Sequence, residues 1–332
     1  MACGTGSGEL HVWDLTDASM EQMPEKHCCL RLHRSAIYSL VFVPAHEGTL
    51  LLTGSDEEIR GWSWKALLGA ASEPPPPLFE LQNPRRSLRR GGLGPLSETS
   101  GLVHDPSSNV LYSAAGDGNA YAWDLGTQKC VTTFSGHSDQ LHCISGRLQR
   151  KQIVTGSEDG TVRLWDVRSG KSTATLLADG SSRGVSHTSS SGVAAAGSEL
   201  GAALVSYGWC GCLAVDESEN WLVAGWGGGF LCTFELSTLA CIACLPTAAS
   251  PQAVCFLPGS ISDLVTAGAE SNMYNWSLTG ELHTRALCSS PSVYALSARR
   301  FEGRGVVVAA GGSADGVDIF MDTSHRAYTL ML

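Results

Sequence analysis

The 332-residue sequence has no run of about 18–20 apolar residues, which is the length that a membrane-spanning helix needs. Its first residues also lack the charged stretch followed by an apolar stretch that marks a secretory signal. The 12 cysteines do not suggest a disulfide framework, because several are adjacent or two residues apart and most fall in predicted strands as small apolar side chains. We therefore expect reduced thiols and a nuclear or cytosolic protein.

Basic residues are scarce as well. The formal net charge of −10 argues against a general nucleic-acid binder, because affinity for phosphate comes from clustered lysine and arginine. The glycine-rich runs Gly4–Gly8 and Gly225–Gly229 match neither a phosphate-binding loop nor a dinucleotide fingerprint, and we interpret them as turns. We find no convergent set of acid, base or nucleophilic groups, so the sequence predicts no enzyme, metal, cofactor or small-molecule substrate.

A short unit that recurs along the chain indicates the architecture. Residues 153–167 contain two short strands joined by a turn at Asp159-Gly160, where glycine tolerates a positive φ, and the unit ends in Trp-Asp. Six further copies align with it, and three of the intervals between their aromatic residues are 42, 42 and 44 residues. The aligned aromatic residues are Trp13, Trp62, Trp123, Trp165, Phe234, Trp276 and Phe320.

A period of about 40–45 residues with an aromatic residue near the end of the third strand resembles the WD-repeat family of β-propellers. Seven copies imply an all-β, seven-bladed propeller that forms one domain over residues 1–332. The absence of extended helical periodicity agrees with this. The expected innermost strands are Ile37–Val43, Gly101–His104, Leu141–Ser145, Cys212–Val215, Ala253–Leu257 and Val293–Ser297. The expected outer strands are Cys130–Phe134, Thr173–Leu177, Ala240–Leu245, Leu282–Leu287 and Arg326–Met331.

Three places depart from the repeat. Loop insertions are expected near residues 72–97 and 178–206, and the Ser/Gly/Ala composition of the second predicts disorder. Met1 falls where the second strand of the first blade should begin, so we expect that blade to be incomplete. Either the blade has three strands or the sequence is a shortened form, and we favour the second explanation.

The fourth repeat carries the four residue types that form a hydrogen-bonded chain in WD-repeat proteins, namely His137, Thr155, Asp159 and Trp165. A buried imidazole or carboxylate needs partners, because an unmet one costs about 1–3 kcal/mol. We therefore assign this set a structural role in preference to a catalytic one. His33 occupies a similar position in the second repeat.

Two further groups of residues could contact partners. The basic run Arg85, Arg86, Arg89 and Arg90 is most simply a solvated loop, and the alternatives are an acidic partner, RNA or a nuclear import receptor. The residues Trp165-Asp166-Val167-Arg168 match the W-D-x-R box with which some WD-repeat proteins dock onto the adaptor of cullin-type ubiquitin ligases. That resemblance implies polar contacts from Asp166 and Arg168.

The Cys241-x-x-Cys244 spacing is typical of metal and redox sites. Residues three apart in a strand face opposite sides of the sheet, however, so we expect neither function from this pair.

Four segments resemble the THO complex subunit 6 family: Gly136–Arg168, Trp209–Leu236, Asn275–Leu282 and Val317–Leu332. The resemblance implies a nuclear, non-catalytic scaffold subunit of the THO part of the transcription–export assembly (TREX), which couples mRNA transcription and processing to mRNA export. The implied partners are other THO subunits, especially the coiled-coil subunits 5 and 7, and indirectly a DEAD-box RNA helicase and mRNA. A substrate receptor of a cullin-type ubiquitin ligase is the alternative.

Overall fold

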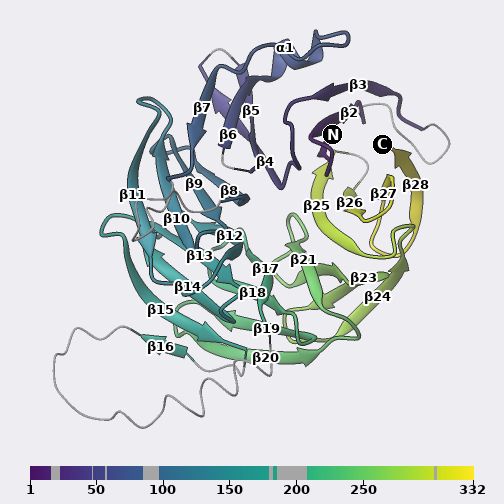
Figure 1. Ribbon diagram of the computed structural model, residues 1–332. Coiled ribbons are helices and arrows are strands. Elements are labelled where there is room, and N and C mark those ends of the chain that lie inside the picture. The colour runs from purple at the N-terminus through teal and green to yellow at the C-terminus, as the bar shows by residue number, and fades with distance from the viewer. Residues whose placement is uncertain are drawn as a thin grey trace. The chain divides into compact units, whose positions relative to one another are not determined.

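Figure 1 shows the computed structural model as a ribbon. It describes residues 1–15, 23–46, 48–56, 58–84, 97–178, 182–184, 208–302 and 305–332. These residues form seven β-sheets, which is the architecture of an all-β seven-bladed propeller, and the first sheet has only three strands. Both features were predicted. The chain divides into two compact units, Met1–Gly146 and Arg147–Leu332. No helix in the described part of the chain is long and apolar enough to cross a membrane.

Three sheets lie wholly within the first unit, and their strand orders are β1-β2-β3, β4-β5-β6-β7 and β8-β9-β10-β11. Their strands are β1 (Ala2–Gly4), β2 (Glu9–Trp13), β3 (Lys26–Arg31), β4 (Ser39–Ala45), β5 (Gly48–Gly54), β6 (Glu58–Ser63), β7 (Phe79–Gln82), β8 (Thr99–Asp105), β9 (Val110–Ala115), β10 (Asn119–Asp124) and β11 (Lys129–Ser135). The first strands of the second and third sheets, β4 and β8, contact each other, as innermost strands of neighbouring blades should.

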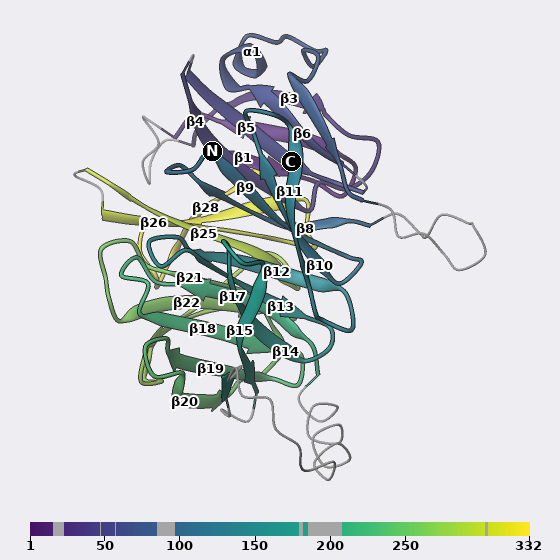
Figure 2. The same ribbon diagram turned by 90° about the vertical axis from the view of Figure 1, so that its left-hand side faces the viewer.

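A short helix, α1 (Trp64–Leu68), follows β6 directly and lies beside β3 and β6 (Figure 2). It begins where the Ser63 hydroxyl accepts the backbone N–H of Ala66 at 3.3 Å, which is an N-cap contact. Leu67 is fully buried and packs with Leu10, Leu30 and Trp62 of the first two sheets. Five residues are too few to show helical periodicity, which explains why the sequence did not predict this helix.

The fourth sheet has the order β12-β13-β14-β15-β16, and the last three sheets run β17 to β20, β21 to β24 and β25 to β28. Their strands are β12 (Leu141–Arg147), β13 (Gln152–Ser157), β14 (Thr161–Asp166), β15 (Lys171–Leu177), β16 (Ser182–Gly184), β17 (Cys210–Val215), β18 (Trp221–Trp226), β19 (Phe230–Glu235), β20 (Ala240–Pro246), β21 (Pro251–Phe256), β22 (Asp263–Gly268), β23 (Glu270–Ser277), β24 (Leu282–Leu287), β25 (Val293–Phe301), β26 (Gly305–Gly312), β27 (Gly316–Phe320) and β28 (Arg326–Met331). In the second unit β17, β21 and β25 contact one another in sequence.

The expected strands are all present, and they differ from the prediction mainly at their ends. Two regions expected to be loop insertions contain strands, β7 in the first and β16 in the second. Leu81 of β7 is buried, and side chains along this strand point alternately inward and outward. The proline run that precedes β7 indicates a loop, so the sequence did not predict this strand. In these two regions, residues 85–96, 179–181 and 185–207 lie outside the described residues.

A β-bulge recurs at the aromatic residue of the repeat. In six sheets the register between the strand that carries the repeat aromatic residue and the strand that follows it shifts immediately before that residue, which is Trp13, Trp123, Trp165, Phe234, Trp276 or Phe320. A bulge places two residues of one strand opposite one residue of the other. The extra residue of β11 is Val131 and that of β20 is Ile242, and both are exposed, at 55% and 43%. The second sheet lacks this bulge, because the pairing of β6 with β7 ends at Gly61.

Candidate structural network and interaction surface

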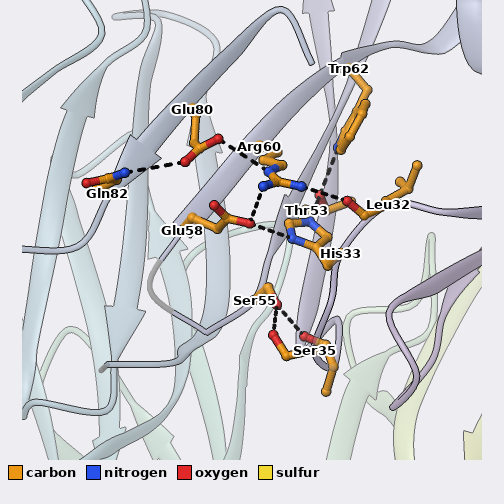
Figure 3. A network of polar contacts seen from close by, with 11 residues as sticks. Leu32, His33, Ser35, Thr53, Ser55, Glu58, Arg60, Trp62, Glu80 and Gln82 are labelled. Atoms are coloured by element: carbon orange, nitrogen blue, oxygen red, sulfur yellow. Dashed lines mark hydrogen bonds and ion pairs between the residues drawn. The ribbon is translucent and has the colours of Figure 1, made fainter. Parts of the chain in front are cut away.

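The second sheet contains a buried polar network centred on His33 (Figure 3). The Nε2 atom of His33 lies 2.7 Å from the hydroxyl oxygen of Thr53, and the indole N–H of Trp62 donates to the same oxygen at 2.9 Å. The ionised carboxylate of Glu58 can only accept, and its Oε1 lies 3.2 Å from Nδ1, so the proton of the neutral imidazole is on Nδ1. The hydroxyl of Thr53 therefore accepts from Trp62 and donates to Nε2. Both ring nitrogens of His33 are therefore engaged.

Charged groups continue the network toward solvent. Arg60 places Nη2 2.8 Å from Oε1 of Glu58 and Nε 3.4 Å from Oε2 of Glu80, and its Nη1 donates to the carbonyl of Leu32 at 2.9 Å (Figure 3). Glu58 and Arg60 are 19% and 26% exposed. This ladder links the segment that precedes β4 with β6 and β7, and it fixes the edge of the second sheet.

Burial sets the protonation of the network. It lowers the pKa of His33 from 6.5 to about 4, and the positive charge of Arg60 adds to this shift. The contribution of His33 to stability therefore falls as the pH drops from 6.5 to 4, because only the unfolded chain binds that proton. Burial, with the hydrogen bond to Glu80, raises the pKa of Glu58 from 4.5 to about 7. The contribution of Glu58 to stability therefore depends on pH in the opposite direction: it is complete below pH 4.5 and is lost as the pH rises to 7.

The contact between tryptophan and hydroxyl recurs in other sheets. The indole N–H donates from Trp123 to Ser113 at 2.9 Å, from Trp165 to Thr155 at 2.8 Å, and from Trp276 to Thr266 at 2.9 Å. In these four sheets, including the second, the contact ties the third strand to the second strand.

In the fourth sheet, Oδ1 of Asp159 accepts the backbone N–H of Thr161 at 2.9 Å and its hydroxyl at 2.7 Å. Gly160 follows with a φ of 76°, so the structure confirms the turn that the sequence indicated. His137 belongs to the first unit and Thr155, Asp159 and Trp165 to the second. The complete four-residue chain therefore stays a prediction.

The two predicted contact groups differ in what the structure describes. Arg85, Arg86, Arg89 and Arg90 lie outside the described residues. The carboxylate of Asp166 accepts the backbone N–H groups of Arg168 and Ser169 at 2.8 and 3.1 Å, and these contacts hold its pKa below the ordinary value. Arg168 is 80% exposed, with Nη2 3.6 Å from Oδ2 of Asp166. Asp166 thus shapes the turn, while Arg168 faces solvent.

The expectation that Cys241 and Cys244 face opposite sides of the sheet is wrong. The bulge in β20 makes Ile242 the extra residue, so Cys241 pairs with Phe234 and Cys244 pairs with Cys232. Phe234 and Cys232 are two residues apart in β19, and both cysteines of β20 therefore face the same side. Sequence spacing alone contains no sign of the bulge.

Sequence reasoning missed one group with metal-ligand spacing, formed by Glu9, His11 and Cys29 of the first sheet. The Nε2 atom of His11 lies 3.8 Å from Oε2 of Glu9 and 3.6 Å from the sulfur of Cys29. Its Nδ1 is buried and has no hydrogen-bond partner. A metal-bound histidine nearly always donates from its second nitrogen to an acceptor. We therefore assign no metal to this group.

Exposed apolar side chains are found on outermost strands of the second unit. Ile242 of β20 and Leu287 of β24 are 43% and 65% exposed, and Met331 of β28 is 63% exposed. β20 has no charged residue, although natural edge strands commonly carry charges that prevent unwanted pairing. These three side chains, which we call the outer-strand apolar residues, are candidates for contact with a partner protein.

Comparison with known proteins agrees with the repeat and with the architecture. The model of the WD domain, G-beta repeat, matches residues 128–166, which run from β11 of the third sheet through β14 of the fourth. The solved WD40 β-propeller domain of Doa1 superposes with a TM-score of 0.69 at 17% identity, covers 96% of this chain and 88% of that chain, and supports the fold alone.

Relatives in plants and animals share most of the length of the chain. THO complex subunit 6 of Arabidopsis thaliana is 33% identical over 297 residues, which are 87% of this chain and 72% of the relative. THO complex subunit 6 of Homo sapiens is 27% identical over 340 residues, with 99% and 88% covered. The plant relative is more than 30% identical and most of its length is covered, so this chain belongs to the THO complex subunit 6 family of WD40 β-propeller proteins.

Proposed function

We propose that this protein is a non-catalytic scaffold subunit of the nuclear THO/TREX assembly, which supports THO assembly and couples mRNA transcription and processing to mRNA export. The observation that carries the proposal is identity to proteins named THO complex subunit 6 over most of the chain, at 33% for the plant relative. The family's propellers are generally non-catalytic. The proposed direct partners are other THO subunits, especially the coiled-coil subunits 5 and 7, whereas the RNA helicase and mRNA are reached indirectly.

The polar network supports a structural role for its ionisable groups. His33 is neutral near pH 7, and both of its ring nitrogens are engaged by Thr53 and Glu58. A general base needs a nitrogen that can reach the proton of a substrate. These groups therefore hold the shape of the edge of the second sheet.

The outer-strand apolar residues supply a surface for protein contact. Ile242 stands out from the sheet because it is the extra residue of a bulge, and Leu287 and Met331 also face solvent from edge strands. Burying such a side chain against a coiled coil contributes about 1.5–3 kcal/mol, and edge exposure makes it accessible to an elongated partner. The net charge of −10 is more consistent with a subunit that binds proteins than with one that binds RNA directly.

Affinity purification of the tagged protein from nuclear extract tests the proposal. The wild-type protein should recover THO subunits, and Ile242→Asp combined with Leu287→Asp should recover much less. Ile261→Asp is the matched control, because Ile261 is 69% exposed in the same unit but lies in a loop. Recovery of a cullin and its adaptor in place of THO subunits, with loss of both in Arg168→Ala, would instead support the ubiquitin-ligase alternative.

A further inference from the structure

Three cysteines converge at the outer edge of the fifth sheet. Cys232 of β19 and Cys244 of β20 are direct cross-strand partners, and their sulfur atoms are 2.7 Å apart. A disulfide bond is about 2.05 Å long, so these two sulfurs lie within about 1 Å of bonding distance. Cys241 faces the same side as Cys244 because of the bulge, and its sulfur also hydrogen-bonds with that of Cys232.

The strand register places this pair where a cross-strand disulfide fits. The backbone N–H of Thr247 donates to the carbonyl of Gly229 at 2.8 Å, which makes that pair a hydrogen-bonded one. Hydrogen-bonded and non-hydrogen-bonded pairs alternate along an antiparallel ladder, so Cys232 and Cys244, three steps along, form a non-hydrogen-bonded pair. Cα atoms of such a pair are about 4.5 Å apart, within the range of about 4.4–6.8 Å that a disulfide spans. The strands need not move to form the bond.

The surroundings give the two sulfurs different roles. Cys244 is exposed on the edge strand, whereas Cys232 is fully buried. The hydrogen bond with Cys241, together with burial, raises the pKa of Cys232, so this sulfur remains a thiol in the resting protein. Both thiols donate to the carbonyl oxygen of Ala178, at 3.3 Å from Cys232 and 3.4 Å from Cys244. Cys244, on the exposed edge, can meet an oxidant, and the buried sulfur of Cys232 lies within reach of the product.

We propose that Cys232 and Cys244 are a redox modification site, at which hydrogen peroxide produces a reversible cross-strand disulfide. The sulfur of Cys244 attacks one peroxide oxygen and breaks the O–O bond, which yields a sulfenic acid and one water. The sulfur of Cys232 then displaces the sulfenic hydroxyl, which leaves as a second water with the remaining thiol proton. Two electrons pass from the two sulfurs to the peroxide, and a dithiol reductant reverses the reaction. The bond ties β20 to β19 and removes both S–H donors from the carbonyl of Ala178.

The experiment uses the purified, reduced full chain, treated with one equivalent of hydrogen peroxide, denatured in the presence of a thiol-blocking reagent and analysed by peptide mass spectrometry. We expect a linked peptide pair containing Cys232 and Cys244, an intact mass lower by two hydrogens, and restoration by a dithiol. The Cys244→Ser variant should lose the link, and it should fold because Cys244 is exposed. Cys130→Ser is the matched control, since Cys130 is an exposed cysteine next to the bulge of β11.

Three results would overturn the proposal. In the first, Cys232 and Cys244 both still react fully with the thiol-blocking reagent after the peroxide treatment. In the second, Cys244 is linked to Cys241 or to a second molecule. The third is protection of all three cysteines before oxidation that a chelator abolishes, because this would identify a metal site in place of a disulfide.

Discussion

The substitution Thr53→Val tests whether the network in the second sheet contributes to stability. Valine keeps the shape of threonine but removes the hydroxyl oxygen that accepts from Trp62 at 2.9 Å and contacts His33 at 2.7 Å. All three side chains are buried, so water cannot replace the lost contacts. Each buried polar group left without a partner costs about 1–3 kcal/mol, and the change orphans two of them, the indole N–H and Nε2 of the imidazole. We therefore expect a loss of about 2–6 kcal/mol.

The assay is thermal and urea unfolding of the variant beside the wild-type protein. For a unit of roughly 150 residues the expected loss corresponds to a fall in melting temperature of at least about 4 °C. Thr49→Val is the control, because Thr49 is exposed on the same strand, β5, and its substitution should change stability by less than about 0.5 kcal/mol. If the two variants unfold alike, the hydroxyl of Thr53 does not hold the network together, and the reasoning fails.

Other predictions concern protonation and the fourth sheet. In wild-type protein the opposed contributions of His33 and Glu58 nearly cancel between about pH 4.5 and 6.5. In the Glu58→Gln variant only the contribution of His33 remains. The free energy of unfolding, measured by urea titration, should therefore fall relative to wild type by up to about 1.4 kcal/mol for each unit by which the pH is lowered in this window. A difference between the two proteins that does not change with pH would contradict this prediction. Asp159→Ala removes two hydrogen bonds to Thr161 and should lower the melting temperature measurably, at a cost of about 1–3 kcal/mol; an unchanged value would count against the turn contact. Oxidation to the Cys232–Cys244 disulfide should slow hydrogen exchange of the β20 amides in the wild type but not in Cys244→Ser, and equal rates would show that the bond does not secure this strand.

The repeat itself was predictable, because each blade needs the same local chemistry. A turn, an aromatic residue near the end of the third strand and alternating strands recur along the chain, and together they predict the order of the sheets. Elements without such repetition were missed. The strand β7 follows Pro74–Pro77, which signals a loop, and α1 is held by one cap and by Leu67 rather than by a long apolar stripe.

The candidate network was only partly predictable, for a geometric reason. His33 was identified by its likeness to His137, but its acidic partner was not. The hairpin between β5 and β6 is one residue shorter than that between β13 and β14, as the pairs Gly54–Ile59 and Gly156–Val162 show. Glu58, the first residue of β6, reaches the imidazole directly after this shorter turn. A motif search for aspartate at a fixed offset therefore overlooks the residue that completes the network.

The bulges explain why reasoning from strand periodicity failed at the cysteines, and they supply a rule that corrects it. In six sheets the register shift comes immediately before the repeat aromatic residue, so the aromatic that defines the repeat also marks where the outermost strand gains a residue. Residues three apart across that point share a face, and in β11 and β20 the extra residue is exposed. Cys241 and Cys244 span this point, with Ile242 between them. The same local irregularity therefore gathers the thiols on one side of the sheet edge and presents an apolar side chain to solvent.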